Sequence, residues 1–518
     1  MSNLRSSMLT PPDAGPNYPR FVKMHQSSID SGLNAQIVIV LEQPPEDTHV
    51  KEERISYDDL VYRSYKLFGT FRRLFVDLIL SFQDRTDSLS LFRQLNMEQA
   101  FKVVEIELTL MYDSLHSKCA VIHGPVGRSL RVFTLAAPAV SLTLFAVYGG
   151  DGGGYEKVDI VISYVLLAGA IFLETYAILL MIISPWTYAH LRETRNCRLA
   201  ADLLFKVLDF FQPESRPRWS NKMAQYNLIS YCLKDKSRWY TRALEKLEWG
   251  GYNIRAKTMW DGLWYTSHTE VLPPLKALVF EQLKEKANST TDPVSYKEFG
   301  QHRGQWVLQR NGCYQQLGWS VEVEFDESIL LWHIATDLCF YDDQHYGFEC
   351  RNLATTSRKL SSYMMFLLVM RPFMMTASIG QIRFGDTCAE AKNFFRRGIE
   401  IVDEKQGARM LSSVNTSNVR PRDIKGDRSK SVLFDACRLA EELRSVQPMF
   451  RRWRIISGVW AEMLCYAAGK CRGNIHAKQL SQGGEVLTMV WLLMAHWGMG
   501  EQYRVESGHA RVKLITET

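Results

Sequence analysis

Two long apolar runs with a short polar segment between them dominate the pattern of hydrophobic and polar positions in this chain. Residues 132–150 hold no Asp, Glu, Lys or Arg, and residues 160–189 hold only Glu174. The segment between them, 151–159, is rich in glycine and suits a tight reversal. Because about 20 apolar residues cross the core of a bilayer, the pattern predicts a transmembrane helical hairpin over residues 129–191.

Helical spacing of apolar residues in the rest of the chain predicts a mainly α fold, with large helical domains attached to the hairpin. The clearest amphipathic helix covers 59–82, and Ser56 has capping-box spacing to Asp59 ahead of it. The apolar face of this helix could pack into a core, or its basic side could lie on an anionic membrane surface. Further helices are predicted over 97–118, 275–286, 326–341, 353–370, 387–403, 432–446, 453–470 and 485–497.

Other segments are assigned from composition and local signals. Strands are predicted over 35–41 and 320–325, and Thr387 with Glu390 has capping-box spacing. Residues 405–430 hold seven Lys or Arg against two Asp and are predicted to be a disordered basic loop. The predicted domains are a flexible segment 1–58, an amphipathic helical region 59–128, the hairpin 129–191, a helical region 192–404, the loop 405–430, a C-terminal helical module 431–500 and a tail 501–518.

Charges around the two apolar runs predict their orientation. Arg128 and Arg131 precede the first run, Arg192 follows the second, and acidic residues dominate the segment between the runs. Because positive residues favour the cytoplasmic side, we expect an integral membrane protein with its bulk in the cytoplasm. Ten cysteines without a C-x-x-C pair fit reduced thiols, and the first 20 residues contain no apolar run typical of a signal peptide.

Composition narrows the class of partner. Hydrophobic residues make up 46% and charged residues 23% of the chain, which is ordinary for a globular protein. A net charge of +6 over 518 residues is too weak to predict nucleic-acid binding. The expected partners are therefore the lipid bilayer and other proteins, or further copies of the chain associating through the spans. No cofactor and no metal site is predicted.

Several long motifs resemble a known family. They are VVEIELTLMYDSLHSK, DIVISYVLLAGAIFLE, FDESILLWHIATDLC and GNIHAKQLSQGGEVLTMVWLLMAHWG. Together they are similar to an uncharacterised plant family, expanded in grasses, that pairs a large N-terminal domain of unknown function (four-two-two-zero) with a short C-terminal one (five-nine-four). The resemblance covers roughly residues 20–500 and implies further transmembrane helices ahead of the matching part, but no activity.

Glu174 is the first candidate site residue. An ionisable group inside a span is costly and usually faces other helices or water. Glu174 could be an ion or proton site, a polar contact between helices, or a protonated side chain hydrogen-bonded within a helix bundle. If it belongs to an ion- or solute-conducting oligomer, Glu174→Gln should alter flux or oligomeric state.

Two pairs of residues outside the hairpin are further candidates. His333 and Asp337 lie four residues apart on one predicted helix and could form a catalytic His–carboxylate pair or a structural one. An enzyme built on them requires that both line an open pocket. His476 and Lys478 precede a predicted helix start at which backbone amides could bind an anion, although Glu485 could instead complement the helix dipole.

These observations favour a membrane-anchored scaffold or regulatory interaction protein rather than an enzyme. The alternatives are an oligomeric ion- or solute-conducting protein that uses Glu174, and an enzyme in the helical domain. Asn288 and Asn415 begin glycosylation sequons, which stay unmodified if the bulk faces the cytoplasm.

Overall fold

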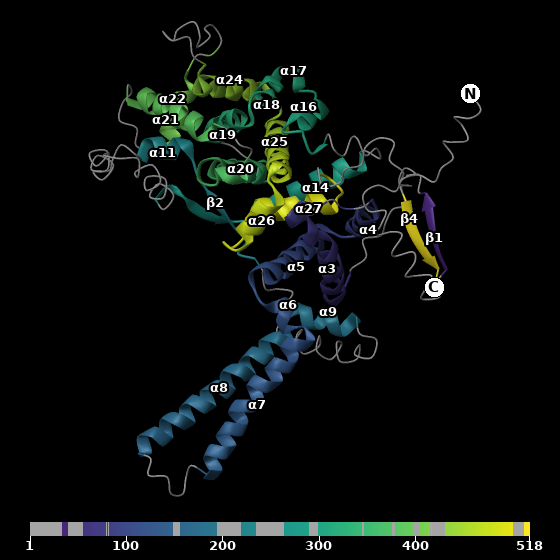
Figure 1. Cartoon of the computed structure of the whole chain (residues 1–518). Coiled ribbons are helices and arrows are strands. Elements are labelled where there is room, and N and C mark those ends of the chain that lie inside the picture. The colour runs from purple at the N-terminus through teal and green to yellow at the C-terminus, as the bar shows by residue number, and fades with distance from the viewer. Residues whose placement is uncertain are drawn as a thin grey trace, which may run out of the picture.

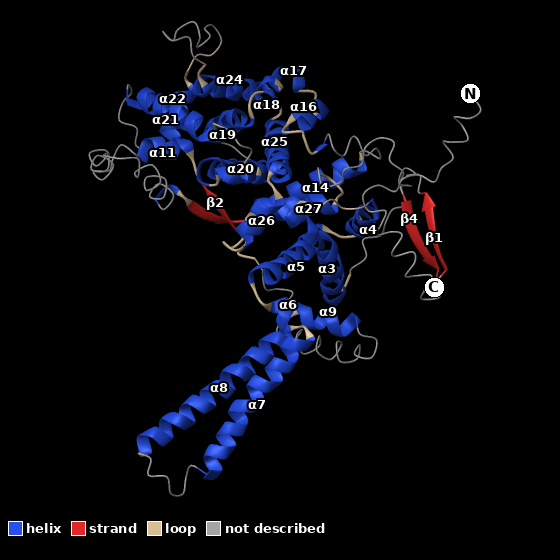
Figure 2. Ribbon diagram, in the orientation of Figure 1, coloured by secondary structure: helices blue, strands red, loops and turns tan. Residues whose placement is uncertain are grey.

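The described chain is almost entirely α-helical, as predicted (Figure 1, Figure 2). The computed structural model describes residues 34–39, 55–78, 80, 82–148, 156–193, 219–234, 264–289, 299–343, 347–375, 379–396, 403–414, 416, 430–500 and 512–517. Its strands form two antiparallel pairs. These are β1 (Asn34–Ile39) with β4 (Val512–Glu517), and β2 (Lys222–Gln225) with β3 (Ser267–Glu270).

The N-terminal helices form the end of the helical body that carries the hairpin (Figure 1). They are α3 (Tyr57–Phe71), the 3₁₀ helix η2 (Arg72–Val76), α4 (Phe82–Phe92), α5 (Met97–His116), α6 (Cys119–Ile122) and, after the hairpin, α9 (Pro185–Glu193). A complete capping box starts α5, because Asn96 accepts a hydrogen bond from the Gln99 amide and Gln99 accepts one from the Asn96 amide.

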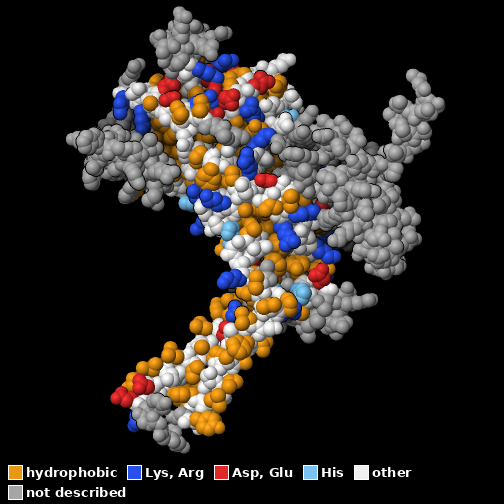
Figure 3. All heavy atoms as spheres, in the orientation of Figure 1, with side chains coloured by type: hydrophobic (Ala, Val, Ile, Leu, Met, Phe, Trp, Pro, Cys, Tyr) orange, Lys and Arg blue, Asp and Glu red, His pale blue; other side chains and the backbone are white. Residues whose placement is uncertain are grey.

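Two long helices leave the body side by side as an antiparallel pair, α7 (Pro125–Tyr148) and α8 (Lys157–Ile183). Both are long and apolar enough to cross a membrane, and the apolar stretch of each is not buried in the protein. Near the far tip, the rings of Phe145 and Tyr164 contact each other at 5.2 Å. Figure 3 shows hydrophobic side chains covering the visible face of the pair along its length.

The remaining helices build the larger part of the body. They are α11 (Leu228–Lys234), α14 (Pro273–Asn288), α16 (Gln305–Arg310), α17 (Tyr314–Leu317), α18 (Trp319–Glu322), α19 (Phe325–Asp342), α20 (Phe348–Met370), the 3₁₀ helix η5 (Pro372–Met374), α21 (Gly380–Arg396), α22 (Glu404–Ser412), α24 (Val432–Ser445), α25 (Met449–Lys470), α26 (Gly473–Leu480) and α27 (Val486–His496). Within this part, α19 packs on α20 and α24, and α20 packs on α25.

Helix α27 is the centre of the body. Every one of its 11 residues is buried, and it is too short to span a bilayer. It contacts α25 on one side and α4 and α5 of the N-terminal helices on the other. The two ends of the chain therefore share one hydrophobic core.

The predicted helix over 59–82 is wrong in its second half. Helix α3 tightens into η2 and the chain reverses at Asp77, whose φ of 54° is left-handed. The Asp77 carboxylate accepts a hydrogen bond from the Gly473 amide at 3.1 Å, and Phe75 meets Trp491 edge to face at 5.1 Å. These contacts with the C-terminal helices decide where the helix ends, and local periodicity contains no information about them. Ser56 bonds Asp58 and makes no capping hydrogen bond.

Three further predictions are corrected by the structure. The second apolar run does not form one helix. Helix α8 ends at Ile183, and Ser184 is extended because a residue before a proline, here Pro185, disfavours the helical conformation. Residues 319–322 form the helix α18 rather than a strand, and the Ser320 hydroxyl bonds the Leu317 carbonyl at 2.6 Å. Thr387 lies inside α21, where its hydroxyl bonds the Arg383 carbonyl, and does not cap a helix.

The predicted disordered loop over 405–430 begins with a helix. The side chain of Asp403 accepts a hydrogen bond from the Gln406 amide at 2.7 Å and starts α22. Ala408 and Leu411 are buried in the core. The basic composition of this segment hid that short apolar face. Residues 417–429 lie outside the described part of the chain.

A substitution at Gly473 tests how closely the N-terminal and C-terminal helices pack at their junction. A Cβ atom at this position would lie 2.0 Å from the Leu74 backbone oxygen, so the backbone of η2 or α26 would have to move. We expect Gly473→Ala to lower the free energy of unfolding by about 2 kcal/mol or more, as overpacked sites do. The matched control is Gly385→Ala, since nothing lies within 4 Å of a Cβ there and alanine favours a helix. Equal stability of the two variants in thermal denaturation would contradict this description of the junction.

Candidate functional site

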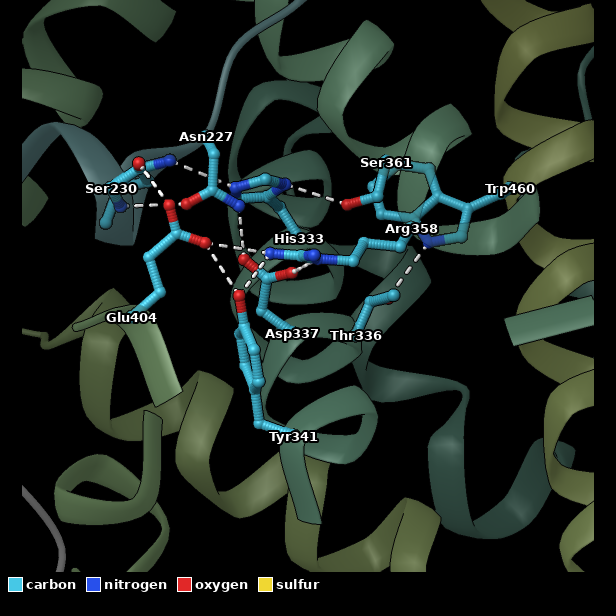
Figure 4. A network of polar contacts seen from close by, with 11 residues as sticks. Asn227, Ser230, His333, Thr336, Asp337, Tyr341, Arg358, Ser361, Glu404 and Trp460 are labelled. Atoms are coloured by element: carbon cyan, nitrogen blue, oxygen red, sulfur yellow. Dashed lines mark hydrogen bonds and ion pairs between the residues drawn. The ribbon is translucent and has the colours of Figure 1, made fainter. Parts of the chain in front are cut away.

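A network of polar side chains lies where α11, α19, α20 and α22 meet (Figure 4). Arg358 of α20 is its centre. The Arg358 guanidinium donates from Nε to Asp337 Oδ1 at 2.9 Å and from Nη2 to Glu404 Oε2 at 3.0 Å. The same Nη2 bonds the Tyr341 hydroxyl, which in turn donates to Glu404 at 2.6 Å. One cation is thus held between two carboxylates from different helices.

Asn227 and helix α11, which follows it, supply the remaining partners of these carboxylates. Asn227 donates from its side-chain amide to Asp337 Oδ2, and its Oδ1 accepts from the Ser230 amide at 2.9 Å. The Ser230 hydroxyl donates to Glu404. As a result, both oxygens of Asp337 and both oxygens of Glu404 accept hydrogen bonds.

The network favours the charged forms of Glu404 and Arg358. Burial alone would raise the pKa of Glu404, but hydrogen bonds from Ser230 and Tyr341 and the charge of Arg358 outweigh burial and lower this pKa. Burial opposes the charged form of Arg358, and Asp337 and its other partners more than compensate, so its pKa is raised. Burial and the hydrogen bond to Glu404 raise the pKa of the Tyr341 hydroxyl. Near neutral pH the tyrosine is therefore a hydrogen-bond donor.

His333 lies behind this network with different partners. It is 0% exposed, and its Nε2 accepts from the Leu228 amide at 3.2 Å. Its Nδ1 therefore carries the proton and donates to the Ser361 hydroxyl at 2.7 Å. Burial lowers the pKa of His333 to about 4. His333 and Asp337 bond other groups, and Asp337 is only 1% exposed, so the open pocket that an enzyme built on this pair requires is not formed.

A cavity of about 360 Å³ lies beside the network rather than over His333. Its wall includes Arg358, Glu404, Asn227 and Ser230 of the network. Aromatic residues form another part of the wall: Tyr231, Trp264, Tyr265 and Phe340. Arg358, Glu404 and Tyr341 could not be found from the sequence, because they lie on three different helices and no local spacing indicates that they meet.

The structure places His476 and Lys478 in different environments. His476 is buried, stacks on Trp491 at 4.4 Å and bonds the Thr488 hydroxyl and the Ala468 carbonyl. Burial lowers its pKa to about 3. Lys478 is exposed on α26.

The start of α27 is already occupied by protein groups. The Tyr363 hydroxyl accepts from the Leu487 amide at 3.1 Å and donates to Glu485 at 3.1 Å. Burial, together with the Glu485 charge, raises the pKa of Tyr363. These contacts take the place that the predicted anion would have.

Glu174 forms an ion pair within the α7–α8 pair. Its Oε2 lies 2.7 Å from Arg131 Nη1 of α7, and the two side chains are 21% and 30% exposed. The structure therefore gives Glu174 a polar contact between the two helices, one of its three predicted roles. Gly169, five residues earlier on α8, has open space around a hypothetical Cβ.

A buried Ser–His–Glu chain was also missed by the sequence analysis. His496 Nε2 lies 2.5 Å from Glu107 Oε2, and His496 Nδ1 lies 2.8 Å from the Ser88 hydroxyl. All three residues are 0% exposed. Burial raises the pKa of Glu107, and His496 opposes this rise. The order of groups is that of a hydrolase triad, but its complete burial makes it a structural link between α4, α5 and α27.

Family models match both ends of the chain. One, described as Domain of unknown function (DUF4220), matches residues 1–232, and one described as Protein of unknown function, DUF594, matches residues 447–499. The chain carries one of these domains at each end. The resemblance to a large N-terminal and a short C-terminal domain is thereby confirmed. No curated protein and no solved structure matches the chain.

These matches divide the described elements into three parts. The N-terminal domain contains the hairpin, and the C-terminal domain contains α25, α26 and α27. Most of the polar network and cavity belongs to the region between the two matches. Among the described residues, no group of three or more His, Cys, Asp or Glu is arranged to hold a metal ion.

The lowered pKa of His333 predicts how the free energy of unfolding depends on pH. This pKa is about 4 in the folded chain against an ordinary value of 6.5, so the unfolded chain binds the proton more readily. The contribution of neutral His333 to the free energy of unfolding is complete above about pH 6.5 and is lost as the pH falls toward 4. At pH 5 the loss is about 2 kcal/mol. We expect the thermal midpoint of the helical signal to fall between pH 7 and pH 5, and to fall less in His333→Gln. The exposed control His268→Gln should keep the wild-type slope, and an unchanged slope in His333→Gln would refute the assignment.

Proposed function

We propose that the protein is a membrane-anchored interaction or scaffold protein, with its helical body on the cytoplasmic side. The observation that carries this proposal is the pair α7 and α8, whose apolar surfaces are exposed along their length while the body has an extensive buried core. Exposed apolar surface of this size is unfavourable in water, and a bilayer removes the cost.

The charge distribution along the pair supports this orientation. Glu156 and Asp159 lie at the tip, and Arg128 and Arg131 lie at the end next to the body. Figure 3 shows acidic side chains gathered at the far tip. Positive residues favour the cytoplasmic side, which would hold the body there and carry only the tip across.

The depth of Glu174 favours an anchor over a conducting pore. At 1.5 Å per residue, Arg131 lies about 26 Å along α7 from Tyr148, and Glu174 lies about 26 Å along α8 from Lys157. In a hydrocarbon core of about 30 Å, the ion pair would lie near the face next to the body, where water and headgroups solvate charges. The alternative conducting oligomer would need Glu174 to face a pathway, whereas here Arg131 neutralises it.

The junction between hairpin and body would hold the body against the membrane. Trp186 of α9 packs edge to face on Phe68 of α3 at 5.3 Å and donates to Asp113 at 3.2 Å. Arg192 of α9 pairs with Asp58 at 3.3 Å and with Asp59. A tryptophan at this position is typical of a membrane interface. Exposed apolar side chains on the body itself, such as Phe348 and Ile382, support contacts with protein partners.

The test is extraction and protease protection of the full chain, tagged at its C-terminus, in microsomes. We expect the protein to stay in the pellet after a carbonate wash, the tag to be digested, and Asn288 to remain without glycan although it is exposed at the end of α14. Replacing residues 125–183 by a short polar linker should release the body into the supernatant.

Each contrary outcome overturns a different part of the proposal. Release of the full chain by carbonate would refute the membrane anchor. A protected tag with a glycan on Asn288 would refute the cytoplasmic orientation.

A further inference from the structure

The cavity of about 360 Å³ between α11, α20 and α22 has the size of a small-molecule site. The helices that line it lie far from the hairpin (Figure 1), so its role is independent of the proposed membrane anchor. Neither family model supplies a ligand or activity for it. The class of ligand therefore has to be inferred from the residues that line the cavity.

The acidic groups at this cavity are already satisfied. Glu404 accepts hydrogen bonds from Ser230, Tyr341 and Arg358, which occupy both its oxygens. Asp337, beneath the wall, accepts from Asn227 and Arg358. A cationic ligand would therefore have to displace internal donors before either carboxylate could bind it.

Donors remain available on the same wall. Arg358 uses Nε and Nη2 for its internal hydrogen bonds, and its Nη1 bonds no other described residue. Lys359, the next residue, also lines the cavity, is half-buried, and forms no hydrogen bond or ion pair with the described chain. The cavity thus presents two unused cationic donors, Arg358 Nη1 and the Lys359 ammonium, and hydrogen bonds from such donors favour an anionic acceptor.

Aromatic rings form the other side of the cavity. Tyr231 and Tyr265 pack edge to face at 4.8 Å, and both line the space. Trp264 also lines it and is 55% exposed. Flat ring faces of this kind favour stacking with an aromatic ligand.

We propose that this cavity binds a small aromatic carboxylate, with the carboxylate at Arg358 and Lys359 and the ring against Trp264 and Tyr265. The fixed guanidinium presents a donor in a set direction, because Asp337 and Glu404 hold it from two sides. Lys359 supplies a flexible second contact. The aromatic wall selects for a ring and the cations select for the charge.

The experiment is calorimetric titration of the full chain in detergent with 1-naphthoate and with its uncharged analogue 1-naphthamide. We expect a Kd below about 1 mM for naphthoate and weaker binding of naphthamide. Lys359→Gln should weaken naphthoate about tenfold and leave naphthamide unchanged, because only the charged contact is lost. Trp264→Ala should weaken both compounds.

Lys478→Gln is the matched control, since it makes the same change at an exposed lysine on α26. It should bind both compounds as the wild type does. Absence of naphthoate binding, equal binding of the two compounds, or a Lys359→Gln variant with wild-type affinity would each overturn the proposal. Equal binding that persists in Trp264→Ala would assign the signal to the apolar hairpin or the detergent.

Discussion

A helix that is apolar on every side has to be enclosed on every side, and α27 imposes this requirement on the whole body. All of its 11 residues are buried, and no single part of the chain covers them. Helix α25 covers one side, and α4 and α5 cover another. Its last residue, His496, is bonded by Ser88 and Glu107, so a polar group in the core has partners from the opposite end of the sequence. Removing one partner from such a buried pair typically costs about 3–5 kcal/mol.

Other buried charges are also paired with partners from distant segments of the chain. Lys286 of α14 pairs with Glu462 of α25 at 2.5 Å, and Arg452 of α25 bonds Asp343 with two contacts of 2.6 and 2.8 Å. The Arg358 network differs in one respect, because it borders a cavity instead of lying fully within the core. Its carboxylates accept hydrogen bonds from the internal arginine, and Arg358 and Lys359 both line the open space. A candidate binding site differs from a structural ion pair in this respect, because some of its donors have no internal partner.

Helix positions could be predicted from the sequence, but the contacts between helices could not. Periodicity located α5 and α25 because each keeps an apolar face over many turns. It failed at Asp77, where a hydrogen bond from Gly473 decides the end of the helix. The composition of 151–159 and the two apolar runs predicted the hairpin. The partner of Glu174 could not be predicted, because it lies on the other helix and no local spacing indicates the contact. The same reason hid Arg358 and Glu404, which meet through folding alone.

The central claim is that the two terminal domains and the region between them fold as one cooperative unit around α27. Hydrogen–deuterium exchange on the full chain in detergent tests it most directly, by comparing the wild type with His496→Ala. We predict that peptides from α5, α25 and α27 are protected to the same degree in the wild type and lose protection together in the variant. If α25 kept its protection while α5 and α27 lost theirs, the body would consist of separate units and the account would be wrong.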